Sequence, residues 1–272
     1  DFSAGAMEAV RDAARNLGLN GERELLASTK LFFHACTVAD NILITRSGPR
    51  TGLITTNGFG DTLLHMRGRT TDGLTETEAF HAVAQSKPEP IVPRPLIEEV
   101  SERIDYKGSV LIRLEPAEAE RAIRNLLAKG VESIGVSLLW ALSNDSHERM
   151  IARIVKEIPA SIYLTLSSEV APFVGEYERT ATTAFNAYIG PKIAVYLRNL
   201  GAVLKEKGLK REPLVMQSYG GVLGIEDTCK NAVGTIESGP ASGVVGSRFI
   251  GERIGLSNIL ATDMGGTTFK VS

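Results

Sequence analysis

The segment NILATDMGGTT, residues 258–268, decides how we interpret the fold of this chain. Its first five residues predict a short apolar strand, 258–262, that leads directly into an acid, Asp263. Two consecutive glycines, Gly265 and Gly266, then allow the backbone to turn tightly. A strand, an acid and a double glycine in this order predict a loop that can approach a ligand closely.

A polyphosphate is the ligand that suits such a loop. Without Cβ atoms, the backbone N–H groups of Gly265 and Gly266 can reach phosphate oxygens, and the hydroxyls of Thr267 and Thr268 add donors. Asp263 is the candidate catalytic residue and the candidate ligand of a metal ion or of its bound water. The simpler alternative, which the double glycine alone favours, is a β-hairpin with the glycines at its tip.

The helix predicted just upstream, 237–254, favours the phosphate-binding loop over the plain hairpin. Gly239, Gly243, Gly246 and Ile250 share one face, so a backbone can approach it closely, either between two hinged lobes or inside one domain. A small-faced helix, an apolar strand and D-x-G-G-T-T in this order resemble the interdomain helix and second phosphate hairpin of the actin, Hsp70 and sugar kinase superfamily. The resemblance implies an α/β, actin-like (ribonuclease H-like) ATPase fold and adds Gly239 to the nucleotide-binding residues.

The rest of the chain alternates predicted helices with predicted strands. Helices are expected over 7–17, 116–130, 147–157 with Ser146 as its cap, and 177–207, bent or broken at Gly190 and Pro191. Strands are expected over 30–36 and 52–55, both central in a sheet, over 133–140 and 162–166, and at the start of 216–221. The polar, proline-containing stretch 69–107 predicts an extended surface loop. This alternation is typical of an α/β fold with a largely covered sheet.

Composition and charge argue against several classes of protein. The chain has 272 residues, 43% of them hydrophobic and 23% charged, which is a globular composition with room for two lobes. With a net charge of -2 and interspersed charges, nucleic acid and anionic membranes are poor partners. Two distant cysteines, a longest apolar run about half of a membrane span and no visible export signal predict a cytoplasmic protein. The motifs of P-loop, serine hydrolase and zincin enzymes are absent from the sequence.

Five segments carry a closer resemblance. In chain order they are HACTVADN at 34–41, TTNGFGDTLLHMR at 55–67, SSEVAPFVGEYERTATTAFNAY at 167–188, MQSYGG at 216–221 and ESGPASGVVG at 237–246. Together they resemble the hydantoinase A family, with its 5-oxoprolinases and its acetone and acetophenone carboxylases, over nearly the whole chain. ERIDYKG at 102–108 and ATDMGGTTFKVS at 261–272 are most similar to the carboxylase branch.

The family resemblance implies a division of the chain and exposes departures from the family pattern. It places a hydantoinase A N-terminal-like lobe at 1–190, the rest of the first lobe with the interdomain helix at 191–255, and the start of the second lobe with its phosphate loop at 256–272. The chain has HACT where the family usually has HGTT, and Lys270, which could pair with phosphate or face solvent, where an acid is frequent. A GGTFTD-like first phosphate hairpin and the C-terminal half of the fold have no counterpart, so the chain alone is expected to bind ATP weakly or not at all.

Members of this family use ATP and Mg²⁺ to activate an oxygen of a ketone enol, a lactam or a hydantoin. The resemblance therefore implies phosphoryl transfer to such an oxygen, and, in the carboxylases, joining to a carboxyl group derived from bicarbonate within a multi-subunit complex. A ketone carboxylase subunit is the leading interpretation, and an ATP-dependent hydantoinase or 5-oxoprolinase is the second. An Hsp70-like regulatory ATPase and a non-catalytic scaffold subunit are the alternatives of another class.

Polar side chains that follow predicted strands are candidates for the substrate cleft. His34 ends an apolar run beside Thr37 and Asn41, where a general acid or a substrate ligand fits an α/β cleft. A lone histidine, however, is more often structural. Asp61, after the GFG turn, either faces the cleft or caps the following helix.

The long helix carries a second set of candidates. Arg179, Thr183 and Asn186 recur at helical spacing and form a polar stripe. This stripe either lines the cleft, with Arg179 and Asn186 near substrate or nucleotide, or forms a hydrogen-bonded seam inside the lobe. The residues alone favour neither, and the family resemblance favours the cleft. For His147 and Glu148, a place in the first turn of a helix accounts for both side chains without any chemistry.

Overall fold

The computed structural model describes residues 2–71, 73–81, 83, 85, 87–264 and 269–272. The expected phosphate-binding residues Gly265, Gly266, Thr267 and Thr268 lie outside the described residues. The chain divides into two compact units: unit 1 comprises Asp1–Ser47 and Ile189–Ser272, and unit 2 comprises Gly48–Tyr188. In sequence, unit 2 is thus inserted into unit 1, and the boundaries predicted at 190 and 255 remain predictions.

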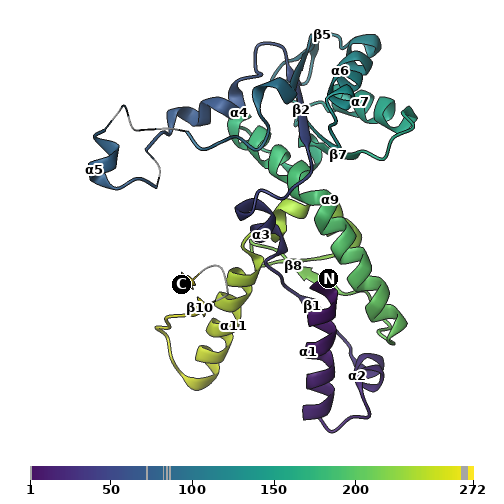
Figure 1. Ribbon diagram of the computed structural model, residues 1–272, viewed down its shortest axis with the longest axis vertical. Coiled ribbons are helices and arrows are strands. Elements are labelled where there is room, and N and C mark those ends of the chain that lie inside the picture. The colour runs from purple at the N-terminus through teal and green to yellow at the C-terminus, as the bar shows by residue number, and fades with distance from the viewer. Residues whose placement is uncertain (1, 72, 82, 84, 86, 265–268) are drawn as a thin grey trace. The chain divides into compact units, whose positions relative to one another are not determined.

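A four-stranded parallel sheet forms the framework of unit 2 (Figure 1). Its strand order is β3 (Ile97–Val100), β2 (Thr51–Thr56), β6 (Ser133–Ser137) and β7 (Tyr163–Leu166). Every residue of β2 and β6 is buried, as expected for inner strands of a sheet covered on both faces. The strands predicted at 52–55, 133–140 and 162–166 are therefore confirmed, the second with a shorter span.

Helices cover both faces of this sheet. α6 (Pro116–Ala128) and α7 (Ser146–Glu157) pack against each other and share a core with Ile134 of β6. Alternate residues of a strand point to opposite faces. The neighbours of Ile134 therefore face the start of α9 (Glu176–Glu206), and a Cβ on Gly135 would lie only 3.2 Å from Thr183 Cγ2. A glycine at 135 allows this close approach.

Pro191 lies inside α9, yet the helix runs unbroken. A proline within a helix lacks the N–H that would bond to the carbonyl four residues earlier, which here belongs to Ala187. The Ser133 hydroxyl of β6 donates to that carbonyl at 2.6 Å and replaces the missing donor. The helix is therefore not broken at 190–191, and a bend at these residues stays a prediction.

The stretch 69–107 is not one extended loop. It contains α5 (Glu76–Ala79), the 3-10 turn Arg94–Leu96, β3 and β4 (Arg103–Ile104). The last proline of the stretch, Pro95, precedes β3. The two central glutamates of β3 are not typical of a strand, although its ends, Ile97 and Val100, are buried. The other elements of unit 2 are α4 (Thr62–His65), η1 (Met66–Gly68), β5 (Val110–Ile112) and α8 (Ser167–Val170). Ser146 is the first residue of α7 and not its cap, because Asp145 holds that position.

Unit 1 combines a small sheet with helices. β1 (Phe33–His34) runs parallel to β8 (Leu214–Met216), which pairs antiparallel with β9 (Val222–Gly224). The helices are α1 (Phe2–Asn16), α2 (Glu22–Ser28), α3 (Val38–Ile44), the rest of α9, α10 (Ile225–Lys230), η3 (Ala232–Thr235) and α11 (Ser238–Ile254). Among the described residues, β1 is paired on one side only, by β8, so the run 30–36 supplies a two-residue edge strand and not the expected central one.

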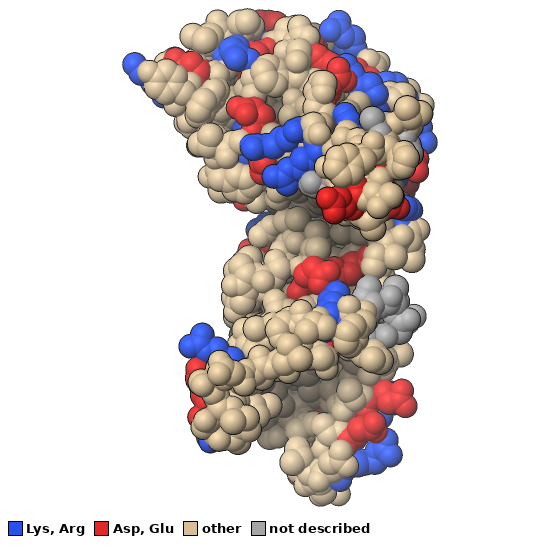
Figure 2. All heavy atoms as spheres, turned by 90° about the vertical axis from the view of Figure 1, so that its left-hand side faces the viewer, with Lys and Arg blue, Asp and Glu red and all other residues tan. Residues whose placement is uncertain are grey.

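The surface shown in Figure 2 carries acidic and basic side chains interspersed, without a large field of one sign on that face. Among the described helices, none combines the length and the apolar character that crossing a membrane requires.

Candidate functional site

The candidate site is centred on an antiparallel hairpin of unit 1. β10 (Thr262–Met264) pairs with β11 (Phe269–Val271), and Asp263 lies directly opposite Lys270. Residues opposite each other in such a pair project from the same face. The hairpin therefore presents a carboxylate from β10 and an ammonium group from β11 on one face. The strand predicted at 258–262 begins only at Thr262.

Lys270 connects the hairpin to the start of α11. Its ammonium group forms an ion pair with the Glu237 carboxylate. Glu237 holds the N-cap position of α11 in a left-handed backbone conformation, with φ 59° and ψ 17°. Its N–H donates to Asp40 Oδ1 of α3 at 3.0 Å. Glu237, at the start of α11, thus contacts both the hairpin and α3.

Asp40 is a buried carboxylate with one unsatisfied oxygen. Its side chain is 7% exposed, and Oδ2 has no hydrogen-bond partner among the described residues. Burial raises the pKa of the Asp40 carboxyl, the nearby Glu237 charge raises it further, and the hydrogen bond from Glu237 opposes both. Buried polar atoms are nearly always hydrogen-bonded, so Oδ2 points to a water or a ligand as its partner.

Two predicted residues meet beside this network. A Cβ on Gly239, in the first turn of α11, would lie 3.6 Å from Thr37 Cγ2. Ser238 Oγ donates to Cys36 O at 3.4 Å, so the loop after β1 lies against the start of α11. Asn41 follows one turn later in α3, where its N–H donates to Thr37 O at 2.9 Å. The N-terminal end of α11 carries the positive end of the helix dipole.

His34 is a packed residue of unit 1. Its Nε2 lies 2.7 Å from Tyr196 Oη, and burial lowers the pKa of its imidazole. Because the folded protein disfavours the imidazolium form, the unfolded chain binds more protons between the two pKa values. The contribution of His34 to stability is therefore present above its ordinary pKa and is lost as pH falls towards the lower folded value.

The substitution His34→Gln should reduce the pH dependence of stability. Glutamine keeps a polar group that can reach Tyr196 but does not titrate. Between about pH 7.5 and about pH 5.5, urea unfolding midpoints should fall less in the variant than in the native protein. An equal fall in both proteins would show that His34 does not titrate differently on folding.

The strand and glycine turn predicted at 216–221 make Gln217 and Ser218 possible cleft residues, whereas Asn231 was not predicted; Gln217 and Asn231 each hold an unsatisfied oxygen among the described residues. Gln217, directly after β8, is fully buried, and its Oε1 and Asn231 Oδ1 lack partners among the described residues. Gln217 Nε2 donates to Val215 O at 3.0 Å. A cleft role for Gln217 stays a prediction, and no pattern in the sequence singled out Asn231.

Asp61, Arg179 and Asn186 lie in unit 2. Asp61 is exposed at the N-cap position of α4, makes no side-chain capping bond and pairs with Arg94 Nε at 2.9 Å. Asn186 is buried, and its Nδ2 donates to Thr165 Oγ1 at 3.0 Å. Thr183 is bonded within α9. The polar stripe is thus hydrogen-bonded inside unit 2, and a role of its members in the substrate cleft stays a prediction.

Arg179 belongs to a buried network around Glu148. Glu148 accepts hydrogen bonds from Leu138 N at 3.1 Å, Ser167 Oγ at 2.6 Å and Ser168 N at 2.9 Å, while Arg179 donates to Ser167 Oγ and to Leu138 O. Burial raises the pKa of the Glu148 carboxyl, and the bonds from the two serines and Leu138 oppose it. Burial likewise lowers the pKa of the Arg179 guanidinium, against the charge of Glu148.

This network lies where the strand order of unit 2 reverses. The chain passes from β2 to β3 on one side and then to β6 on the other, and ligands of open α/β sheets bind at the carboxyl ends of strands at such a point. A cavity of about 10 Å³ lies there, lined by Phe59, Ser137 and Arg179 among others. Its volume matches about one water molecule. Arg179 Nε has no partner among the described residues and lines this cavity.

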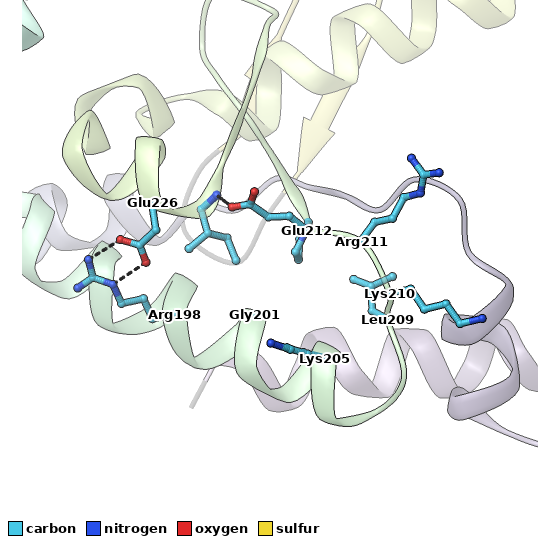
Figure 3. A pocket seen from close by; sticks show the side chains of 10 residues that line it. Arg198, Gly201, Lys205, Leu209, Lys210, Arg211, Glu212 and Glu226 are labelled. Atoms are coloured by element: carbon cyan, nitrogen blue, oxygen red, sulfur yellow. Dashed lines mark hydrogen bonds and ion pairs between the residues drawn. The ribbon is translucent and has the colours of Figure 1, made fainter.

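Unit 1 also has an open groove of about 470 Å³ between α9 and α10 (Figure 3). Arg198 donates to Glu226 at 2.9 and 2.8 Å, and Glu212 accepts from Ile225 N at 2.8 Å. Lys210 and Arg211 point away from the centre of the groove in Figure 3. The basic groups therefore do not converge on one ligand position.

A resident metal cluster is not formed by the described side chains: no three His, Cys, Asp or Glu among them are arranged to hold an ion. Mg²⁺, however, is usually bound by one or two carboxylates together with substrate phosphates and waters. The exposed Asp263 carboxylate of β10 fits that mode. The donor set therefore suits an ion that arrives with a nucleotide.

Comparisons with known proteins match both parts of the chain. Residues 1–159 match a family model described as "Hydantoinase/oxoprolinase N-terminal region", and residues 179–272 match one described as "Hydantoinase/oxoprolinase". The acetophenone carboxylase gamma subunit of Aromatoleum aromaticum is 36% identical over 281 residues, which covers 100% of this chain and 38% of that protein.

Two solved structures share the fold. Acetone carboxylase in its nucleotide-free form matches with a TM-score of 0.90 and 30% identity, over 99% of this chain and 38% of that one. ATP-dependent caprolactamase from Pseudomonas jessenii matches with a TM-score of 0.83 and 30% identity, over 97% of this chain and 37% of that one. The predicted α/β, actin-like fold class is confirmed. The chain spans less than two fifths of the length of each of these relatives.

Proposed function

The chain belongs to the hydantoinase/oxoprolinase family, and from this membership we propose that it is part of an ATP-dependent enzyme subunit that activates a carbonyl or enol oxygen by phosphoryl transfer. The observation that carries the proposal is the hairpin of β10 and β11. It sets Asp263 opposite Lys270, on either side of the sequence Gly-Gly-Thr-Thr at 265–268. ATP dependence is stated for acetone carboxylation and for caprolactamase, and we extend it to this chain.

In this proposal unit 1 binds and orients the polyphosphate of ATP. Donors to the phosphate oxygens are the backbone of Gly265 and Gly266 and the hydroxyls of Thr267 and Thr268. The positive end of the α11 dipole, at Gly239, adds a favourable field. Mg²⁺, when bound, neutralises charge on the phosphoryl group. Asp263 orients the waters of that ion and so positions the transferred group.

We propose a ketone as the substrate, joined after activation to a carboxyl group from bicarbonate. The acetophenone carboxylase gamma subunit and acetone carboxylase match nearly the whole chain, and this supports the proposal. Since the former is named as a subunit, further subunits are proposed partners, and the cytoplasmic location expected from the sequence belongs to the same proposal. The second candidate is hydrolysis of a cyclic amide, a lactam or hydantoin, which the match to caprolactamase favours.

Roles at the substrate are proposed for the polar residues of both units that the sequence singled out, namely His34, Thr37, Asn41, Asp61, Arg179 and Asn186. Arg179 has the strongest support among them. Its Nε is a buried donor without a partner among the described residues, and it lines a cavity at the reversal of strand order. A buried guanidinium donor of this kind suits a carbonyl or carboxylate oxygen.

The full-length protein with its partner subunits should release ADP from ATP when a small aromatic or aliphatic ketone and bicarbonate are both present. ADP release should be at least about tenfold slower with hydantoin or caprolactam, because phosphoryl transfer requires the acceptor oxygen that the site positions. A coupled assay of ADP measures both rates, with ketone or bicarbonate omitted as controls. Faster release with a cyclic amide would favour the second candidate, and equal rates without any substrate would contradict both.

A further inference from the structure

Lys270 is the single basic residue of the hairpin sequence 262–271. Its partner position across the hairpin is Asp263, so its ammonium group lies on the same face as the carboxylate expected to bind Mg²⁺. The side chain is 20% exposed and turns towards Glu237 at the start of α11. The ammonium group of this β11 lysine is therefore held by a carboxylate from another element, the start of α11.

Glu237 holds this position with unusual backbone geometry. A non-glycine residue in the left-handed region is strained, and such strain persists where surrounding contacts fix it. The contacts here are the hydrogen bond from its N–H to Asp40 Oδ1 and the ion pair with Lys270. The Glu237 side chain itself is 54% exposed. The backbone is thus fixed, whereas the carboxylate stays accessible to solvent and exchangeable.

The charges around Lys270 make Glu237 and a nucleotide competitors for its ammonium group. Asp40, Glu237 and Asp263 are acidic, and Lys270 is the cation that contacts Glu237. A polyphosphate carries several negative charges and attracts an ammonium group more strongly than a single carboxylate does. An exposed ion pair, in contrast, is weakened by solvent and salt. Lys270 can therefore leave Glu237 for a phosphate, but only against the attraction of Glu237.

We propose, building on the nucleotide-binding function above, that Lys270 binds the polyphosphate of ATP and that Glu237 competes with ATP for its ammonium group. In the nucleotide-free protein, Glu237 of α11 holds the ammonium group of Lys270. ATP then takes over the lysine and leaves Glu237 unpaired. Lys270 is in this way a phosphate-binding residue, and Glu237 is a positioning residue that lowers the affinity for ATP.

Nucleotide affinities of variants of the full-length protein in its complex test this competition. Lys270→Met should weaken ATP binding about tenfold or more, because a charge-assisted contact to phosphate is lost. Glu237→Gln should strengthen it about threefold, because the carboxylate that competes with ATP for Lys270 is removed. In the double variant, affinity should equal that of Lys270→Met alone, since no cation remains for Glu237 to compete for. Adenosine affinity should not change in any variant.

Two matched variants show whether the charge at position 270 itself is responsible. Lys210→Met removes an exposed lysine elsewhere in unit 1 and should leave ATP affinity unchanged. Lys270→Arg keeps the charge and should retain most of the affinity, which distinguishes loss of charge from misfolding. The competition is disproved if Lys270→Met binds ATP within about twofold of the native protein. It is also disproved if Glu237→Gln weakens ATP binding as Lys270→Met does. If the native complex binds no ATP, the proposed function itself fails.

Discussion

Replacing Asp263 with asparagine in the full-length protein should reduce substrate-dependent ADP release by about 100-fold or more. Asparagine keeps the size of the side chain but removes the negative charge that we propose holds Mg²⁺ or its waters. The fold should be unaffected, because Asp263 is exposed in β10. The variant should also require a higher Mg²⁺ concentration for half-maximal turnover, which a magnesium titration of the ADP assay measures.

Asp227→Asn is the matched control for this change. Asp227 is an exposed acid of α10 in the same unit, where it pairs only with the neighbouring Lys230. Its substitution should leave turnover and magnesium dependence unchanged. If Asp263→Asn kept native turnover, the chain would be better described as a non-catalytic scaffold that has retained the fold.

Glu148→Ala should lower the free energy of unfolding by about 3–5 kcal/mol. The change removes the common acceptor of Leu138 N, Ser167 Oγ and Ser168 N, and so leaves three buried donors unsatisfied. It also removes the charge that opposes the cost of burying Arg179. Urea unfolding followed by circular dichroism measures the loss.

Glu120→Ala provides the comparison for that measurement. Glu120 lies on the exposed side of α6 and accepts two hydrogen bonds from Arg124, at 3.0 and 2.6 Å. Exposed pairs of this spacing contribute about 0.5 kcal/mol or less. A loss for Glu148→Ala as small as that for Glu120→Ala would contradict the role given to the buried network.

Helices and strands with a periodic or apolar sequence could be predicted. Elements that depend on contacts with another part of the chain could not. β2 and β6 are inner strands, and their apolar runs identified them. Only the two ends of β3 are buried, and its two central residues are glutamates. Its sequence therefore has neither the alternation nor the apolar run that would predict a strand. The continuity of α9 through Pro191 depended on a hydroxyl from Ser133, which lies on another element.

The site shows the same limit. Helical spacing correctly grouped Arg179, Thr183 and Asn186 on one stripe, but spacing does not say what lies opposite a stripe. Thr165, which accepts from Asn186, comes from β7. Glu237 and Asp40 are 197 residues apart in sequence, and no local pattern connects them. The family resemblance supplied the phosphate loop, whereas the unsatisfied oxygens of Asp40 and Gln217 required the fold.

The insertion of unit 2 into unit 1 sets the order in which the chain can fold during synthesis. Residues 48–188 leave the ribosome as one uninterrupted stretch, so the parallel sheet of unit 2 can form at once. β1, in contrast, must wait until all of unit 2 and then Leu214 and Val215, its partners in β8, have been translated. Pairing β1 with β8 closes a long loop, and loop closure costs conformational entropy. Once unit 2 has folded, less of the chain between these two strands is flexible, so the cost is smaller. Damage to unit 2 would therefore also delay assembly of unit 1.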